Sequence, residues 1–145
     1  MAFEYKEHQA DIGIVGIGST LEESFEEAAK AMFEIMTDIS RVKDKEKVKL
    51  EVNADSLDKL LIEFLNELLF LKDSKAMLFS LFAANIHKHK DENGVIQYNL
   101  KARIFGETTD TQRHFLKTEV KAATYSGLKV YELAGKFYSE CVVDV

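Results

Sequence analysis

Residues 11–23 read "DIGIVGIGSTLEE", and this stretch indicates a strand that runs directly into a helix. Residues 12–18 are apolar or glycine at every position, so the strand is predicted to be buried on both faces and central in its sheet. Thr20 followed by Glu23 is the pattern of a capping box that starts a helix. The helix then carries an apolar stripe that extends from Leu21 to Met36.

The glycines of this stretch do not form a dinucleotide-binding loop. Gly13, Gly16 and Gly18 follow the order G-x-x-G-x-G, whereas such a loop needs G-x-G-x-x-G because each glycine has its own steric task. We therefore predict that these glycines allow close packing or bulges of the strand.

The remaining pattern predicts an α+β fold. Apolar residues at three- and four-residue spacing between Leu57 and Leu69 predict a second helix, capped by Asp55 and preceded by a strand around residues 48–52. The second half changes to strand patterns in residues 77–89, 95–105, 115–125, 128–134 and 137–145, with Asn93-Gly94 as a two-residue hairpin turn. We expect a single domain over residues 1–145, with mainly antiparallel β-sheets and two principal helices packed on them.

Composition restricts the class of function. The single cysteine, Cys141, excludes an internal disulfide, and we expect a cytoplasmic protein because neither a leader sequence nor a membrane-length apolar stretch is visible. The formal net charge is −6. Proteins that bind nucleic acid alone use a lysine and arginine footprint, so direct RNA binding is not expected to be the main activity.

The C-terminal stretch "FYSECVVDV", residues 137–145, is a strand that remains apolar to its last residue. Asp144 places a carboxylate beside the terminal carboxylate, which predicts a positive group nearby. If this strand neighbours the strand that begins at Asp11, then Asp11, Asp144 and the terminal oxygens of Val145 could form an all-oxygen site for calcium or magnesium. The alternative is a turn at Asp11 and a solvated Asp144, and spacing alone favours this alternative, because pairing across the whole chain cannot be derived from it.

Other patterns give no catalytic site. His87 and His89 lie on one face of a predicted strand and could bind zinc, but no third ligand accompanies them, so a solvated hairpin tip is favoured. No serine–histidine–acid set, H-E-x-x-H motif or phosphate loop is recognisable.

Together, several blocks of sequence carry a family resemblance. The pattern from His8 through "ADIGI", "TLEESFEEAAKAMF" and "LLIEFLNELLFL", then "GE", "RH", "TEVKAATYSGL" and the terminal "VVDV", resembles the archease family. The resemblance implies an accessory protein of tRNA splicing and RNA repair. Such a protein activates an RtcB-type RNA ligase, which uses GTP and a divalent metal, by promoting its guanylylation and multiple turnover.

The resemblance also implies particular site residues. The calcium (Ca2+) site of the family maps onto Asp11, Asp144 and Val145, with Mg2+ or Mn2+ as alternatives. Lys121, Glu107 and His8 are the candidates for activation of the partner.

Three classes of function remain open at this point. The first is a ligase activator without catalysis of its own. The second is a chaperone-like modulator of a tRNA methyltransferase. The third, a metal-dependent hydrolase at Asp11 and Asp144, would need a general base that the sequence does not supply. The expected partners are therefore proteins, with neither strong direct nucleic-acid binding nor membrane association.

Overall fold

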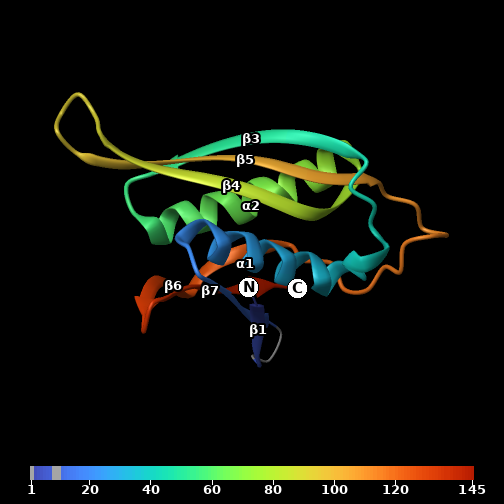
Figure 1. Ribbon diagram of the computed structural model, residues 1–145. Coiled ribbons are helices and arrows are strands. Elements are labelled where there is room, and N and C mark those ends of the chain that lie inside the picture. Colours follow the sequence, from blue (N-terminus) through green and yellow to red (C-terminus); the bar gives the residue numbers. More distant parts are fainter. Residues whose placement is uncertain (1, 8–10) are drawn as a thin grey trace.

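Two antiparallel sheets enclose both helices. The computed structural model describes residues 2–7 and 11–145. Its elements are β1 (Ala2–Glu7), β2 (Asp11–Gly18), α1 (Leu21–Met36), the 3-10 helix η1 (Ile39–Arg41), β3 (Glu46–Ala54), α2 (Leu57–Lys75), β4 (Met77–Lys90), β5 (Ile96–Thr108), β6 (Ala122–Leu133) and β7 (Lys136–Asp144). One sheet has the order β1-β2-β7-β6, and the other has the order β3-β5-β4. The helices lie between the sheets and form the middle of three layers (Figure 1). The predicted α+β fold with two principal helices is confirmed.

The core lies in the helical layer. The apolar stripes of α1 and α2 supply most of the fully buried side chains, among them Phe25, Phe33, Phe64 and Leu65. Within the described residues, no helix is long and apolar enough to cross a membrane.

β2 and α1 approach each other so closely that only glycine fits between them. A Cβ atom on Gly16 would lie 2.1 Å from the carbonyl oxygen of Ser24 and 2.4 Å from the backbone nitrogen of Ala28. The hydroxyl groups of Ser24 and Ser139 form a buried hydrogen bond of 2.8 Å, which ties α1 to β7 as well. The prediction that glycine serves close packing in this stretch is confirmed at Gly16.

Each helix begins at a hydroxyl cap. The Thr20 Oγ1 accepts a hydrogen bond from the Glu23 backbone N–H at 3.0 Å, as predicted. At α2 the prediction of Asp55 as the cap is wrong by one residue. Ser56 is the cap, since its Oγ accepts from the Lys59 N–H at 3.2 Å, while Asp55 forms an ion pair with the Lys59 Nζ.

The hairpin between β4 and β5 has a longer connection than predicted. Only Gly94 in this turn has a positive φ, 78°, whereas the predicted two-residue turn needs positive φ at Asn93 as well. The Asp91 carboxylate accepts hydrogen bonds from the N–H groups of Asn93 and Val95, and these bonds stabilise a five-residue connection over residues 91–95.

The two strands predicted at residues 115–125 and 128–134 are also corrected. β6 is one strand, interrupted by a bulge in which Gly127 has a φ of 62°. Residues 115–121 are not part of a strand. Their backbone instead follows the end of α1, where the N–H groups of Lys117 and Thr118 donate to the carbonyls of Met36 and Ile35.

The connection from β5 to β6, residues 109–121, is anchored by a buried carboxylate. Glu107 is 3% exposed and accepts hydrogen bonds from the guanidinium of Arg113, at 2.5 and 2.8 Å, and from the Lys43 N–H, at 2.7 Å. His114 Nδ1 accepts from the Asp110 N–H, so His114 Nε2 carries the proton and donates to Glu107 at 3.0 Å. These bonds, with those from Arg113 first among them, hold the pKa of Glu107 well below its usual range.

Replacing Gly16 by alanine tests the contact between β2 and α1. The added methyl group would overlap the backbone of α1, so Gly16→Ala should lower the free energy of unfolding by at least about 2 kcal/mol in urea titrations. Gly94→Ala is a matched control, because nothing lies within 4 Å of an added Cβ there and only the positive φ adds a cost. An equal loss in both variants would contradict the close contact at Gly16.

Replacing Glu107 by glutamine tests the buried anchor. Glu107→Gln should lower the Tm at pH 7 by roughly 5 °C, because the charge-assisted bonds to Arg113 and His114 are lost. A carboxyl group whose pKa is depressed by folding stabilises the protein above its unfolded pKa, near 4.5, and this contribution disappears as the pH falls. The Tm difference between wild type and variant should therefore shrink between pH 6 and pH 3. Glu132→Gln, at an exposed carboxylate without an ion pair to a described residue, should show no such pH dependence.

Candidate functional site

Asp11 and Asp144 face each other at one end of the four-stranded sheet. β2 and β7 are antiparallel neighbours, and their register pairs Asp11 with Asp144. Directly opposed residues of an antiparallel pair place their side chains on the same face, with Cβ atoms about 5 Å apart. Both aspartates are half-buried. The two strands are therefore neighbours, which was the condition for a shared site.

Val145 and Lys121 extend this end of the sheet. Val145 directly follows β7, and its side chain packs against the core. The backbone N–H of Lys121 donates to the carbonyl of Asp144 at 2.8 Å, and the Lys121 side chain is exposed. We call Asp11, Asp144 and the backbone oxygens of Val145 the carboxylate rim.

The donor atoms of the carboxylate rim fit a hard cation. All are oxygens, and two carboxylates directly opposite each other repel unless a positive charge lies between them. Among the described residues, no cluster of three or more His, Cys, Asp or Glu side chains is suited to hold a metal. Within the described part of the chain, further ligands would be backbone oxygens or water.

The C-terminal end of α1 lies against the start of β2, on the face of the sheet that Ile12 and not Asp11 presents to the helix. Ile12, next to Asp11, lines a shallow hollow of about 350 Å³ together with Ile35 and Thr118. The last turn of α1 has no basic residue, and the carbonyl groups at its end carry partial negative charge. Lys117 supplies a cation from another segment, since its Nζ donates to the Glu34 carbonyl at 3.0 Å.

Of the other predicted site residues, Glu107 does not join this arrangement. Glu107 belongs to the buried anchor of the connection, where its oxygens bind groups of the same chain and its carboxylate is not exposed for contact with a partner. His8 lies outside the described residues.

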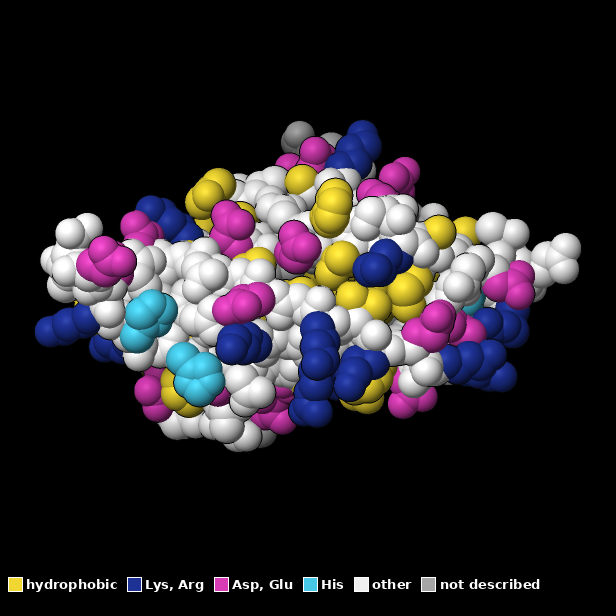
Figure 2. Space-filling view, turned by 90° about the horizontal axis from the view of Figure 1, so that it is seen from above, with side chains coloured by type: hydrophobic (Ala, Val, Ile, Leu, Met, Phe, Trp, Pro, Cys, Tyr) yellow, Lys and Arg dark blue, Asp and Glu magenta, His cyan; other side chains and the backbone are white. Residues whose placement is uncertain are grey.

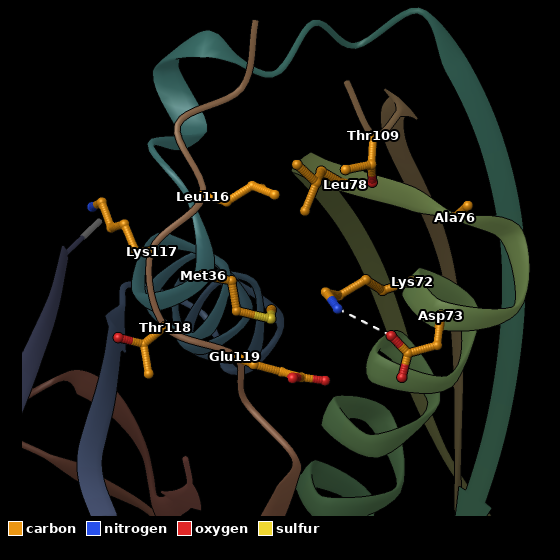
Figure 3. A pocket seen from close by; sticks show the side chains of 10 residues that line it. All are labelled: Met36, Lys72, Asp73, Ala76, Leu78, Thr109, Leu116, Lys117, Thr118 and Glu119. Carbon is orange, nitrogen blue, oxygen red and sulfur yellow. Dashed lines mark hydrogen bonds and ion pairs between the residues drawn. The ribbon is translucent and has the colours of Figure 1, made fainter. Parts of the chain in front are cut away.

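A separate pocket of about 450 Å³ lies between the C-terminal ends of the helices and residues 109–119 (Figure 3). Met36, Leu78 and Leu116 point into this space, whereas Lys117 points away from it. At its edge, the Lys72 Nζ and the Asp73 carboxylate form an ion pair of 3.0 Å. The pocket and the carboxylate rim share no residue, but residues 116–119 line the pocket and Lys121 follows them at the rim.

Sequence reasoning did not predict the contacts that Arg113 and Lys117 make. Both belong to an irregular segment, where no periodicity relates a residue to its partner. Arg113 occurs in the "RH" block of the resemblance, which marked it as a residue of interest without indicating that it binds Glu107.

Comparison with known proteins identifies the family. The sequence model of the Archease protein family matches residues 3–145. Protein archease of Pyrococcus abyssi is 40% identical over 144 residues, covering 99% of this chain and 98% of that protein. Protein archease of Thermococcus gammatolerans is 41% identical with the same coverage.

Two solved structures share the fold. The solution structure of Methanobacterium thermoautotrophicum protein 1598 superposes with a TM-score of 0.80 at 30% identity, covering 99% of this chain and 98% of that one. The crystal structure of a Thermotoga maritima protein, described as an archease and possible chaperone, gives a TM-score of 0.58 at 21% identity, with coverages of 98% and 96%, and supports the fold alone. The family match over nearly the whole chain and the identities of about 40% show that this chain belongs to the archease family.

Proposed function

We propose that this chain is an accessory protein of tRNA splicing and RNA repair that activates an RtcB-type RNA ligase. It promotes guanylylation of the ligase and multiple turnover. The observation that supports this proposal is the position of the carboxylate rim. Asp11, Asp144 and Lys121 come from separate parts of the chain and meet at the end of a sheet, where Lys121 is exposed. An exposed group of charges suits contact with another protein.

The carboxylate rim would hold the divalent cation of this proposal. Asp11, Asp144 and the oxygens of Val145 would bind Ca2+, with Mg2+ or Mn2+ as alternatives. A bound cation would supply positive charge at the surface that meets the ligase. The protein's own contribution is to orient the donors, because pairing in the sheet fixes Asp11 against Asp144 and the Lys121 N–H fixes the backbone of Asp144.

The positions of the three described histidines do not favour catalysis by the chain itself. His87 and His89 are on β4 in the other sheet, and His114 is buried against Glu107. Among the described residues, no histidine therefore lies at the carboxylate rim to act as a general base. This is the reason for proposing an activator in place of a metal-dependent hydrolase.

The apolar pocket favours a second candidate function. Leu116 lines it and is 47% exposed, and the adjacent Phe115 is 58% exposed. Exposed apolar residues beside an apolar pocket suit contact with a protein chain. They are compatible with a chaperone-like modulator of a tRNA methyltransferase. Affinity capture with the native protein, followed by assays of both enzymes in the captured material, separates a ligase partner from a methyltransferase partner.

Activation of the ligase can be tested together with the role of Lys121. Wild-type protein should accelerate formation of the covalent guanylyl-ligase in a time course with labelled GTP. Lys121→Glu should reduce this stimulation about tenfold, through a contact worth about 1.4 kcal/mol, and leave calcium affinity unchanged.

Lys75→Glu is the matched control, because Lys75 is exposed at the end of α2 and the change in charge is the same. Equal rates with and without the wild-type protein would overturn the activator proposal. Equal stimulation by both variants would remove Lys121 from the contact.

The metal site can be tested with isosteric substitutions. Asp11→Asn and Asp144→Asn should each weaken Ca2+ binding at least about tenfold in calorimetric titrations, because the affinity for hard cations depends on ligand charge. Without metal, neither variant should be less stable than wild type, since removing one carboxylate relieves repulsion between the two.

The Tm gain that calcium gives the wild type should be reduced in both variants. Asp55→Asn, at an exposed aspartate that pairs with Lys59, should behave like wild type. Calcium affinity that is unchanged in both rim variants would exclude a shared site.

A further inference from the structure

The outer face of the three-stranded sheet gathers four cations and one carboxylate, Glu51, which lies directly opposite Lys101. Lys47 and Lys49 of β3 and Lys101 and Arg103 of β5 point away from the helices, since the residues that alternate with them, such as Leu50 and Ala102, are buried. We call these four side chains the basic face. Figure 2 looks down on this side of the molecule and shows Lys and Arg side chains gathered in its lower middle, with histidines to their left.

The four cations are crowded together. The register places Lys49 directly opposite Arg103, and residues two apart on one strand are separated by only about 7 Å. All four are exposed, and none forms an ion pair with a described residue. The neighbouring Glu51 accepts a hydrogen bond of 2.6 Å from the Asn99 amide.

This arrangement is unfavourable for the isolated fold. Like charges directly opposite each other in a sheet are destabilising. Lysines on an edge strand are explained by protection against strand pairing between molecules, and this accounts for Lys47 and Lys49 on β3. It does not account for Arg103, which lies on the central strand β5 directly opposite Lys49, whereas Lys101 lies opposite Glu51. The positive charge on β5 therefore points to an anionic ligand.

The composition of the face favours nucleic acid over protein. Lysine is depleted in protein interfaces, whose centres are apolar and aromatic, whereas surfaces that bind nucleic acid are polar and strongly positive. Exposed Asn53 and Asn85 lie on the flanking strands, and neutral side chains of this kind contact phosphate and sugar. One shallow hollow of about 460 Å³ is lined by three of the cations, Lys49, Lys101 and Arg103, together with Asn85 and the single carboxylate Glu51.

We propose that the basic face binds the phosphodiester backbone of a nucleic acid, independently of base sequence. The only aromatic ring among the outward residues of β3 and β5 is Phe105, which is half-buried, so base stacking contributes little. The net charge of −6 repels nucleic acid from the rest of the surface. Binding is consequently weak, sensitive to salt and restricted to this face. The inference does not rest on the proposed ligase function.

Fluorescence anisotropy with a labelled RNA of mixed sequence tests the proposal in buffer without divalent metal. Four phosphate contacts predict a slope of about −3 in a plot of log K against log salt concentration between 50 and 200 mM. The double variant Lys101→Glu with Arg103→Glu should bind at least about tenfold more weakly at 50 mM salt and show a slope reduced by between one and two.

The control is Lys75→Glu with Lys136→Glu, which makes the same change in net charge at exposed residues outside the basic face. It should retain most of the affinity, and circular dichroism should show both double variants folded. A single-stranded DNA and a duplex RNA identify the preferred backbone, and binding of any of the three supports the proposal.

Three results would overturn the proposal. The first is the absence of binding to every nucleic acid at 50 mM salt, and the second is an equal loss of affinity in the two double variants. The third is binding of poly-glutamate at the basic face as tightly as RNA, which would identify an acidic protein as the ligand. None of them affects the ligase assay, so the two proposals fail independently.

Discussion

The antiparallel pairing of β2 with β7 is the contact on which the rest of this molecule depends. It joins a strand near the start of the chain to the strand at its end, and these two form the centre of the four-stranded sheet. α1 packs on both strands, through the close approach at Gly16 and the buried hydrogen bond between Ser24 and Ser139. The same pairing sets Asp11 opposite Asp144. A shift of register by one residue would place the apolar side chains of β7 on the wrong face and separate the two carboxylates.

The buried charge of Glu107 performs a second structural task, away from the carboxylate rim. Irregular segments have few ways to hold a fixed path, because they lack the repeating hydrogen bonds of strands and helices. Glu107 supplies that fixation by binding Arg113 and His114 at one end of the 109–121 connection. At the other end, Lys121 is held by the backbone of Asp144. A buried, hydrogen-bonded residue thus fixes one end of the connection whose other end lies beside the carboxylate rim.

The distribution of charge suggests how two different contacts could coexist on one small protein. The carboxylate rim belongs to one sheet and the basic face to the other, with both helices between them. A carboxylate rim that meets a protein through its cation and a basic face that meets phosphates would hold the two ligands at separate surfaces of the molecule.

The sequence by itself determined the elements whose signals are local. The apolar stripes predicted α1 and α2, and alternation of apolar and polar residues between glycines predicted most strands. These signals are local, because the burial of a residue follows from its own chemistry and that of close neighbours. The α+β class and the candidate pair Asp11 and Asp144 followed from these signals. Local chemistry could not decide the cap of α2 or the turn at Gly94, because alternative hydrogen bonds compete there within a few residues. It could not decide the path of residues 115–121 either, because their hydrogen bonds come from a distant helix.

Only the tertiary structure decided which strands are neighbours and where charges gather. Strand alternation states that one face is buried but not which strand lies beside it, so the opposition of Asp11 and Asp144 required the β2–β7 register. Net charge is a sum over the whole chain, and it concealed the basic face because Lys49 and Arg103 are brought together only when β3 pairs with β5. Both results depend on contacts between residues far apart in sequence, and the free energy of such contacts is a property of the folded arrangement rather than of any short segment.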